Sequence, residues 1–243
     1  MPHRRKFSPD RPALIGLIGG MSWESSAQYY RLINEGFRDR LGGSASAPIL
    51  MWSFDFAQIE ALQHAGDWDA LAGRMADAAR ALQKGGAEFL VLCTNTMHRC
   101  AWAIDAAVKI PLLHIADPTA AAIQAAGLTR VGLLGTAFTM EQDFYRGRLE
   151  HDFGLDVLIP EADDRRAVHE IIYHELVAGQ VLDASREVYR GVIARLVERG
   201  ARAIILGCTE IMLLVGEDDS AVPLFDTTTL HARAAVETAL GAI

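Results

Sequence analysis

The chain has 243 residues with a formal net charge of −8 at pH 7, and 51% of its residues are hydrophobic. This length accommodates one large α/β domain or two domains of about 100–150 residues, with enough apolar content for substantial cores. The acidic balance argues against nucleic acid or an anionic membrane surface as a partner. No apolar run approaches the roughly 20 residues that span a bilayer. The three cysteines have no paired spacing, which is typical of a reducing cytoplasm.

The first residues of the chain, 1–12, are basic and polar and lack the apolar stretch of a signal peptide. They are predicted to form a disordered leader, with the first folded domain beginning at residue 13. Together with the cysteine usage, this composition predicts a cytoplasmic protein.

Strand and helix patterns alternate along the rest of the chain. Strands are expected at residues 13–20, 49–54, 89–92, 111–115, 130–134, 155–159, 203–206 and 222–225. Helices are expected at residues 22–41, 55–64, 67–84, 96–108, 117–126, 139–151, 163–178, 183–199, 209–215 and 227–240. Ser22, Asp67 and Asp183 occupy the positions of helix caps. This alternation predicts parallel sheets joined by right-handed crossovers.

Two of the expected strands break abruptly into small polar residues. Residues 89–92 run into Cys93-Thr94-Asn95-Thr96, and residues 203–206 run into Gly207-Cys208-Thr209-Glu210. Both strands are apolar throughout, the pattern of parallel strands buried on both faces. The carboxyl end of such a strand is where open α/β sheets bind ligands. These two strand ends are therefore the candidate functional sites.

The two strand ends also belong to an internal repeat. At an offset of 114 (208 − 94), Cys208 falls on Thr94 and Leu196 falls on Leu82. Residues 15–20 likewise resemble 131–136, and residues 111–115 resemble 223–227. One explanation is that all buried parallel strands look alike. Pairs that recur in the same order favour a duplicated α/β unit instead.

The repeat predicts two similar α/β domains with parallel sheets, related by an internal pseudo-two-fold duplication. The last strand and helix resemble the end of the first unit, so they are expected to return to the first domain. The predicted domains are residues 13–116 plus 216–243, and residues 117–215.

Cys208 differs from the other two cysteines in its setting. It follows a glycine at a strand end, beside an expected helix N-terminus, a setting that lowers the pKa of a thiol and favours thiolate. Cys93 lies one residue before the polar break, so its side chain points away from that of Thr94. Cys93 and Cys100 are expected to be small buried hydrophobes, and Cys208 a reactive thiol.

Three other sequence features do not indicate a cofactor or metal site. Gly16-x-x-Gly19-Gly20 is not the dinucleotide fingerprint, and it indicates either a bare turn or an anion-binding helix N-terminus. His169 and His174 lie five residues apart and do not share a helix face, so no metal site is predicted. The lysines at positions 6, 84 and 109 lie away from the functional edge of the sheet, which disfavours pyridoxal phosphate.

Two side chains have open interpretations. His98 either orients a reacting group or caps its own helix. Arg165 or Arg166 either pairs with a substrate carboxylate through its planar fork or is solvated on a helix surface.

Three stretches carry a family resemblance: residues 18–25 (IGGMSWES), Thr94-Asn95-Thr96-Met97-His98, and Gly207-Cys208-Thr209-Glu210. They resemble the opening loop, the Cys-Asn-Thr-x-His motif and the second cysteine motif of the aspartate/glutamate racemase family. The resemblance covers almost the whole chain from residue 14 onward. It implies two domains with a small-molecule site in the cleft between them, and racemisation of acidic amino acids without a cofactor.

The family uses one cysteine from each half, and this chain departs at the first. The family cysteine directly precedes the asparagine, and Thr94 holds that position here. The internal repeat indicates the same residue, since Cys208 aligns with Thr94. The threonine–cysteine pair resembles the subgroup that acts from the L side on aspartate and glutamate.

Thr94 and Cys208 are therefore expected to be catalytic, transferring protons on opposite faces of the α-carbon. Side-chain and backbone donors near the strand ends would stabilise the enolate-like carboxylate. The residues expected to bind the substrate are Met21, Ser22, Gln63, Asn95, Thr96, Thr136, Arg165, Thr209 and Glu210.

Two alternatives remain at this stage. One is hydantoin racemase or decarboxylase-like activity within the same superfamily, and the other is a non-catalytic amino-acid-binding protein. The sequence leaves open the physiological substrate, the anchor of the distal carboxylate and the efficiency of reaction from the D side. It also leaves open the oligomeric state, with a homodimer as one option.

Overall fold

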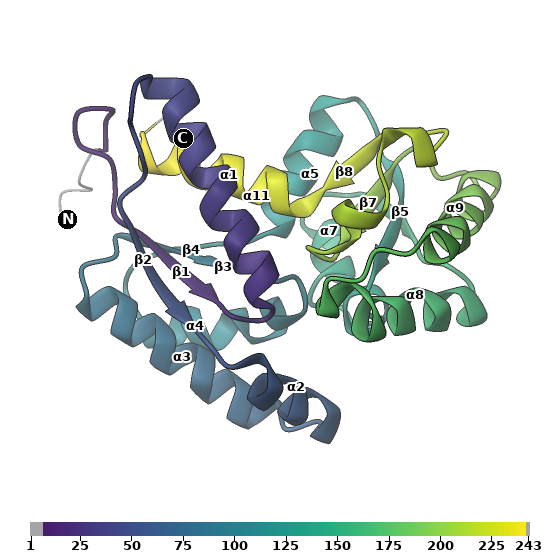
Figure 1. Cartoon of the computed structure of the whole chain (residues 1–243), viewed down its shortest axis with the longest axis horizontal. Helices are drawn as coiled ribbons and strands as arrows, with labels where there is room; N and C mark the ends of the chain where they lie inside the picture. Colours follow the sequence, from purple (N-terminus) through teal and green to yellow (C-terminus); the bar gives the residue numbers. More distant parts are fainter. Residues whose placement is uncertain (1–6, 242–243) are drawn as a thin grey trace. The chain divides into compact units, whose positions relative to one another are not determined.

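A computed structural model describes residues 7–241, which form two compact α/β units (Figure 1). Within these residues the first unit consists of residues 7–93, 100–114 and 231–241. The second unit consists of Thr94–Arg99 and Ile115–Leu230. The chain therefore enters the second unit briefly after residue 93, before its main crossing after residue 114.

The first unit alternates strands and helices as the sequence predicts. Its elements are β1 (Ile15–Gly19), α1 (Trp23–Leu41), β2 (Ile49–Ser53), α2 (Phe56–Ala65), α3 (Trp68–Lys84), β3 (Phe89–Leu92), α4 (Ala101–Ala107) and β4 (Leu112–Leu113). A 3-10 helix, η1 (Thr96–Cys100), precedes α4.

The second unit repeats the pattern with shorter helices. Its elements are α5 (Ala116–Ala125), β5 (Arg130–Gly135), α6 (Ala137–Glu141), α7 (Arg146–His151), β6 (Asp156–Leu158), α8 (Ala162–His174), η2 (Leu176–Ala178), α9 (Asp183–Glu198), β7 (Ile204–Gly207), α10 (Ile211–Leu214), η3 (Glu217–Asp219) and β8 (Leu224–Asp226). The final helix α11 (Thr227–Ala239) begins in the second unit and continues into the first.

Both sheets have the same topology. Their strand orders are β2-β1-β3-β4 and β6-β5-β7-β8, and every neighbouring pair is parallel. The central strands β3 and β7 are fully buried, as their unbroken apolar sequences indicate. The predicted α/β class, with two parallel sheets in two units, is confirmed.

The same glycine contact recurs in the two units. A Cβ on Gly16 of β1 would lie 2.7 Å from Leu90 Cδ2 and 3.4 Å from Leu82 Cβ. A Cβ on Gly132 of β5 would lie 2.7 Å from Ile204 Cδ1 and 3.4 Å from the Cβ of Leu196. In each unit a strand glycine therefore lets a helix leucine approach the sheet closely. This equivalence matches the predicted repeat, in which Leu82 pairs with Leu196.

The predicted domain boundaries are wrong at the C-terminal end. Strand β8 pairs with β7, with Leu224 opposite Ile204, so the segment up to Leu230 belongs to the second unit rather than the first. Only the part of α11 from His231 onward returns to the first unit, as far as residue 241. A short apolar strand fits either sheet equally well, and its ladder partner, which the sequence does not reveal, decides the assignment.

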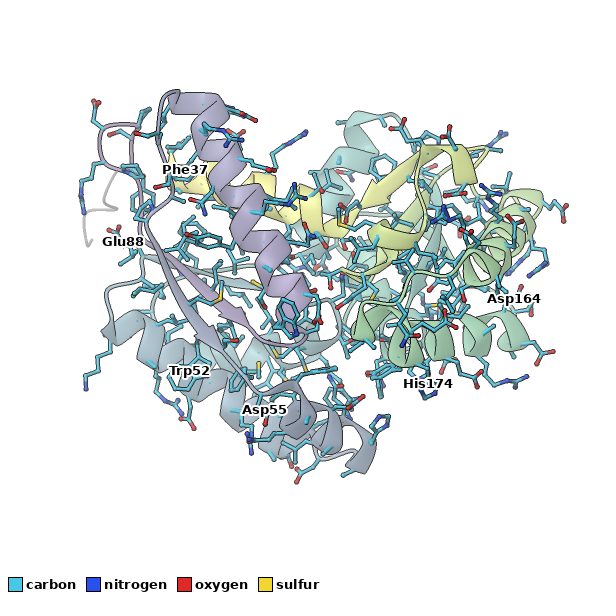
Figure 2. The ribbon with its side chains drawn as sticks, in the orientation of Figure 1. Phe37, Trp52, Asp55, Glu88, Asp164 and His174 are labelled. Carbon is cyan, nitrogen blue, oxygen red and sulfur yellow. The ribbon has the colours of Figure 1, made fainter. Side chains whose placement is uncertain are left out.

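The predicted leader is partly revised. Residues 1–6 lie outside the described residues, whereas residues 7–12 have defined contacts. The backbones of Ser8 and Arg11 exchange two hydrogen bonds, and Arg11 pairs with Glu88 at 3.3 Å (Figure 2). The same carboxylate accepts the backbone N–H of Leu14 at the start of the sheet. Glu88 therefore ties this segment to the first unit.

Helix α1 is amphipathic. Tyr29, Ile33 and Phe37 recur every four residues and are buried in the first core (Figure 2 labels Phe37), while Arg31 and Glu35 pair on the exposed face. Helices of this kind pack on a sheet. Among residues 7–241, no helix combines the length and apolarity that a bilayer crossing requires.

The turn from β1 into α1 satisfies its own polar groups. Gly20, with a φ of 82°, donates its N–H to Ser26 Oγ at 2.7 Å, and Ser25 donates its N–H to Ser22 Oγ at 3.2 Å. Ser22 is therefore the predicted N-cap of α1. These bonds show that the Gly19-Gly20 motif forms the turn into α1, and anion binding there stays a prediction.

Candidate active site

Polar residues gather at the carboxyl ends of three neighbouring strands in the second sheet. Thr136 follows β5, Cys208 follows β7 and Thr227 follows β8, and all three are buried. A Cβ on Gly135 would lie 2.8 Å from the carbonyl oxygen of Gly207. Only glycine therefore allows the ends of β5 and β7 to approach so closely.

The Thr94–Thr96 segment joins this group. Asn95 Nδ2 donates to Thr227 Oγ1 at 3.1 Å, and Thr227 Oγ1 in turn donates to the carbonyl of Leu206 at 2.9 Å. Thr96 Oγ1 and Thr136 Oγ1 share a hydrogen bond of 3.0 Å. The structure thus places the first polar motif in the same unit as the cysteine motif. Sequence reasoning assigned it to the first domain because it follows a first-domain strand.

Cys208 lies in an acidic microenvironment. Its thiol donates to Glu210 Oε2 at 3.0 Å, and the hydroxyl of Thr209 donates to the same oxygen at 2.7 Å. Burial, together with the charge and hydrogen bond of Glu210, raises the pKa of Cys208 well above its ordinary value. The lowering that the sequence predicted is wrong, because α10 is only four residues long and the carboxylate outweighs the nearby backbone N–H groups.

We expect Glu210→Gln to accelerate alkylation of Cys208 by iodoacetamide at pH 7. The carboxylate charge raises the pKa of the thiol, so removing it lowers that pKa and increases the thiolate fraction. Mass spectrometry of the labelled peptide over pH 6–10 would show the labelling curve displaced to lower pH. An unchanged or slower curve in the variant would contradict this account of Glu210.

The other cysteines are core residues, as predicted. Cys93 and Cys100 are 0% and 1% exposed, and Cys93 packs in the core of the first unit. Burial raises the pKa of Cys93 far above the ordinary thiol value.

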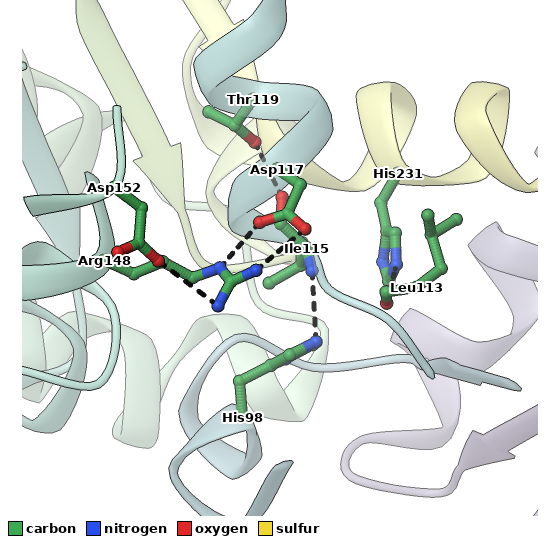
Figure 3. Close-up of polar contacts among 8 residues, drawn as sticks. All are labelled: His98, Leu113, Ile115, Asp117, Thr119, Arg148, Asp152 and His231. Atoms are coloured by element: carbon green, nitrogen blue, oxygen red, sulfur yellow. Dashed lines mark hydrogen bonds and ion pairs between the residues drawn. The ribbon is translucent and has the colours of Figure 1, made fainter. Parts of the chain in front are cut away.

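His98 is buried beside the candidate site and is held at both ring nitrogens. Nδ1 lies 2.7 Å from the carbonyl oxygen of Thr94, and Nε2 lies 3.2 Å from the backbone nitrogen of Ile115 (Figure 3). The ring therefore contacts the main chain of Thr94. The backbone N–H that the ring accepts is that of Ile115, which precedes α5, so His98 does not cap its own helix, and the structure favours the interpretation in which it orients a neighbouring group.

Arg165 is already paired in the second unit. Its Nε donates to Glu141 Oε1 at 2.8 Å, and NH1 donates to the carbonyl of Pro160 at 2.7 Å. A substrate carboxylate would have to share or replace these partners. Arg166 pairs with Asp163 on the exposed face of α8, in line with the solvated interpretation.

Three predicted substrate-binding residues belong to the first unit. Met21 and Gln63 are buried there, and Ser22 caps α1. Nothing in the geometry of their own unit assigns them to a substrate, so their binding role stays a prediction.

The two histidines of α8 have different surroundings. His169 Nδ1 accepts the N–H of Ala137 at 3.2 Å, and its ring contacts Phe138 and Tyr173. His174 is exposed at the end of the helix (Figure 2). In residues 7–241 no group of three or more His, Cys, Asp or Glu side chains is arranged to hold a metal ion.

Sequence reasoning missed Thr227 and His169 as neighbours of the site. Thr227 was visible only as the last residue of the repeated segment 223–227, where the equivalent position is Ile115. The change from isoleucine to threonine at a strand end was the available signal. His169 carried none, because its partner is a backbone N–H.

The fold defines a two-unit α/β protein in which buried polar side chains gather at the strand ends around Cys208. Comparison with known families supplies the assignment: the model of the Asp/Glu/hydantoin racemase family matches residues 18–235. The chain belongs to this family.

Individual relatives agree with this assignment. An Asp/Glu racemase candidate from Yersinia pestis is similar in structure, with 53% identity, a TM-score of 0.87 and coverage of 93% of this chain and 98% of that chain. An aspartate racemase homologue from Pyrococcus horikoshii OT3 has 31% identity and a TM-score of 0.80 over 93% of this chain and 98% of that chain. The broad specificity amino-acid racemase RacX of Bacillus subtilis (strain 168) is 26% identical over 174 residues, which cover 72% of this chain and 74% of RacX.

Proposed function

We propose that the protein is an amino-acid racemase that acts on aspartate or glutamate without a cofactor, with a preference for the L side. The observation that carries this proposal is the buried Cys208–Glu210 pair, which lies in the same unit as the Thr94–Thr96 segment. Family membership and the two structural relatives named for aspartate or glutamate chemistry support it.

In the proposed reaction, Cys208 is the base toward the L enantiomer. Glu210 lies within hydrogen-bond distance of the thiol and can accept its proton, leaving a thiolate. A thiolate whose thiol has a raised pKa is less abundant but more basic, which suits removal of a weakly acidic α-hydrogen. The α-hydrogen moves to sulfur as a proton, and its electron pair stays on the planar α-carbon.

Inversion then requires a proton on the other face. We assign this step to the hydroxyl of Thr94, which donates its proton to the α-carbon and recovers one from water, while the Cys208–Glu210 pair releases to water the proton that it took from the substrate. An aliphatic hydroxyl is a much weaker acid than a thiol, so this donation is slow. The enzyme is therefore expected to exchange the α-hydrogen of the L enantiomer faster than it inverts it.

Asn95 has an acceptor suited to the substrate ammonium group. Its Nδ2 donates to Thr227, while Oδ1 is buried and is among the few side-chain atoms of residues 7–241 that lack a hydrogen-bond partner. A buried carbonyl oxygen without a donor is destabilising until one binds. We therefore assign the side-chain oxygen of Asn95 as an acceptor from the substrate amine.

The carboxylate donors are then the hydroxyls and backbone N–H groups near Thr96 and Thr136. Thr209 donates its hydroxyl proton to Glu210, and its backbone N–H bonds toward Cys208, so Thr209 is proposed to support the cysteine beside the substrate. Arg165 is proposed to bind the distal carboxylate of the substrate, which would replace Glu141 as the partner of the guanidinium group. Met21, Ser22 and Gln63 are retained as proposed contacts.

The test is a panel of L- and D-aspartate, L- and D-glutamate, neutral amino acids and a 5-substituted hydantoin, each followed by chiral separation. Acidic amino acids should be racemised, and added pyridoxal phosphate should have no effect. Conversion of the hydantoin alone would overturn the substrate assignment, and binding without α-hydrogen exchange would indicate a non-catalytic binding protein. The neutral substrates are included because RacX is named for broad specificity.

A further inference from the structure

We propose that His98 is a positioning residue that fixes the main chain of Thr94, and through it the hydroxyl that donates the second proton. The inference rests on the proposed function, because it concerns the inversion step of that reaction. It adds a role to a residue that does not itself contact the reacting carbon.

Each residue of the Thr94–Thr96 segment is held by a different partner in the second unit. Asn95 is held by Thr227, and Thr96 is held by Thr136. Thr94 is held through its carbonyl by His98 at 2.7 Å, a bond between residues four apart. The backbone N–H of His98 also donates to the carbonyl of Asn95 at 3.1 Å. One residue therefore fixes two successive carbonyl groups of the segment.

The bonding partners fix the tautomer of His98. The carbonyl of Thr94 only accepts, so Nδ1 must carry the proton. The N–H of Ile115 only donates, so Nε2 must be the unprotonated acceptor. The ring is thus neutral, with Nδ1 donating one hydrogen bond and Nε2 accepting another. These two bonds make it a rigid link between two backbone segments.

The far end of this link is itself well anchored. Ile115 is fully buried, and its carbonyl accepts the hydroxyl of Thr119 at 3.0 Å. Asp117, in the first turn of α5, accepts two bonds from Arg148 at 2.6 and 2.9 Å (Figure 3). His98 therefore transmits the position of the α5 N-terminus to Thr94. A side chain on such a fixed backbone has a defined location, which proton transfer requires.

His231 provides a matched comparison in the first unit. It is fully buried, its Nδ1 lies 2.8 Å from Tyr29 Oη, and its Nε2 lies 2.8 Å from the carbonyl oxygen of Leu113 (Figure 3). It is therefore another buried histidine that is bonded at both nitrogens and holds a main-chain group near residue 114. It makes no contact with Thr94 among the bonds described for residues 7–241, so its loss reports general destabilisation.

Two variants separate the bonds of His98. In His98→Asn the amide Nδ2 takes the place of Nδ1 and can still donate to Thr94. In His98→Gln the longer side chain places its amide nearer to the position of Nε2, so the hydrogen bond donated to the carbonyl of Thr94 is lost. For each variant we would measure inversion of L-aspartate by chiral separation and α-hydrogen exchange with retained configuration in deuterated water. His231→Gln is the control.

The ratio of inversion to retained exchange distinguishes positioning from folding. Exchange from the L side needs Cys208 only, whereas inversion also needs Thr94, and both rates scale equally with the amount of folded protein. We expect the ratio to fall by about tenfold or more in His98→Gln. It should stay within about threefold of the parent in His98→Asn, and it should be unchanged in His231→Gln.

Equal loss of both rates in His98→Gln would overturn the positioning role. So would an equal fall in the ratio for His98→Asn and His98→Gln, because the Nδ1 donor would then not be the feature that matters. A parent enzyme that shows no inversion would instead refute the proposed function.

Discussion

Cys208→Ala is expected to reduce racemisation by roughly a hundredfold to ten-thousandfold, the range that a positioned proton-transfer group contributes. The variant removes only the sulfur atom that bonds to Glu210, and the cavity that it leaves is small. Ligand binding should therefore persist. Turnover would be followed by chiral separation, and binding of L-aspartate by titration calorimetry. Both measurements are needed, since loss of binding would imply a collapsed site.

Cys93→Ser is the matched control for this experiment. Cys93 is fully buried in the core of the first unit, and its sulfur lies 3.9 Å from the carbonyl oxygen of Val91. The folded variant should keep most of its activity. Residual activity of Cys208→Ala within about tenfold of the parent, roughly 1.4 kcal/mol in barrier, would count against its role. An equal loss in Cys93→Ser would indicate that the other thiol reacts.

Thr94→Cys is expected to raise the rate of inversion by at least about tenfold. A thiol has a reference pKa of about 8.5, whereas an aliphatic hydroxyl is a far weaker acid and a poor base unless it is assisted. The substitution supplies a competent proton carrier on the second face. The D enantiomer, whose reaction begins at Thr94, should then exchange its α-hydrogen as readily as the L enantiomer exchanges in the parent.

The measurement compares deuterium incorporation and inversion from each enantiomer in parent and variant. At equilibrium the enantiomers remain equal, so the asymmetry appears only in exchange rates and in the separate values of kcat and KM. Equal exchange from both enantiomers in the parent would contradict the assignment. It would mean that Thr94 is activated by a neighbouring group or a bound water.

Much of the fold follows from local patterns in the sequence. Continuous apolar runs at 89–92 and 203–206 correspond to the buried strands β3 and β7, and the repeat of Leu82 as Leu196 anticipates the matching glycine contacts. The predicted helix over 139–151 is instead two short helices, α6 and α7, with extended backbone at Gln142. The Gln142 side chain accepts from Arg99, a residue 43 positions away, and such distant bonds leave no periodic signal.

The site was predictable in its residue types but not in its energetics. The glycine before Cys208 and the polar residues after it marked a strand end where the structure places buried polar contacts, and the reactivity of the thiol stays a prediction. The direction of the pKa shift of Cys208 could not be read, because it depends first on the burial of the thiol and then on the Glu210 carboxylate, which turns back to the sulfur at 3.0 Å. The pairing of Arg165 with Glu141, 24 residues away, was equally invisible to sequence reasoning.

Residues 94–99 belong to the second unit although the segments on either side of them belong to the first, and this limits how the chain can be divided into fragments. A fragment that begins at residue 115 would contain β5 to β8 and Cys208, but it would lack the partners that Thr227 and Thr136 find in Asn95 and Thr96. A fragment that ends at residue 114 would carry those two side chains without their acceptors. The duplicated halves are therefore not independent modules, because the polar residues that follow residue 93 bond to residues that lie after residue 114 in the sequence.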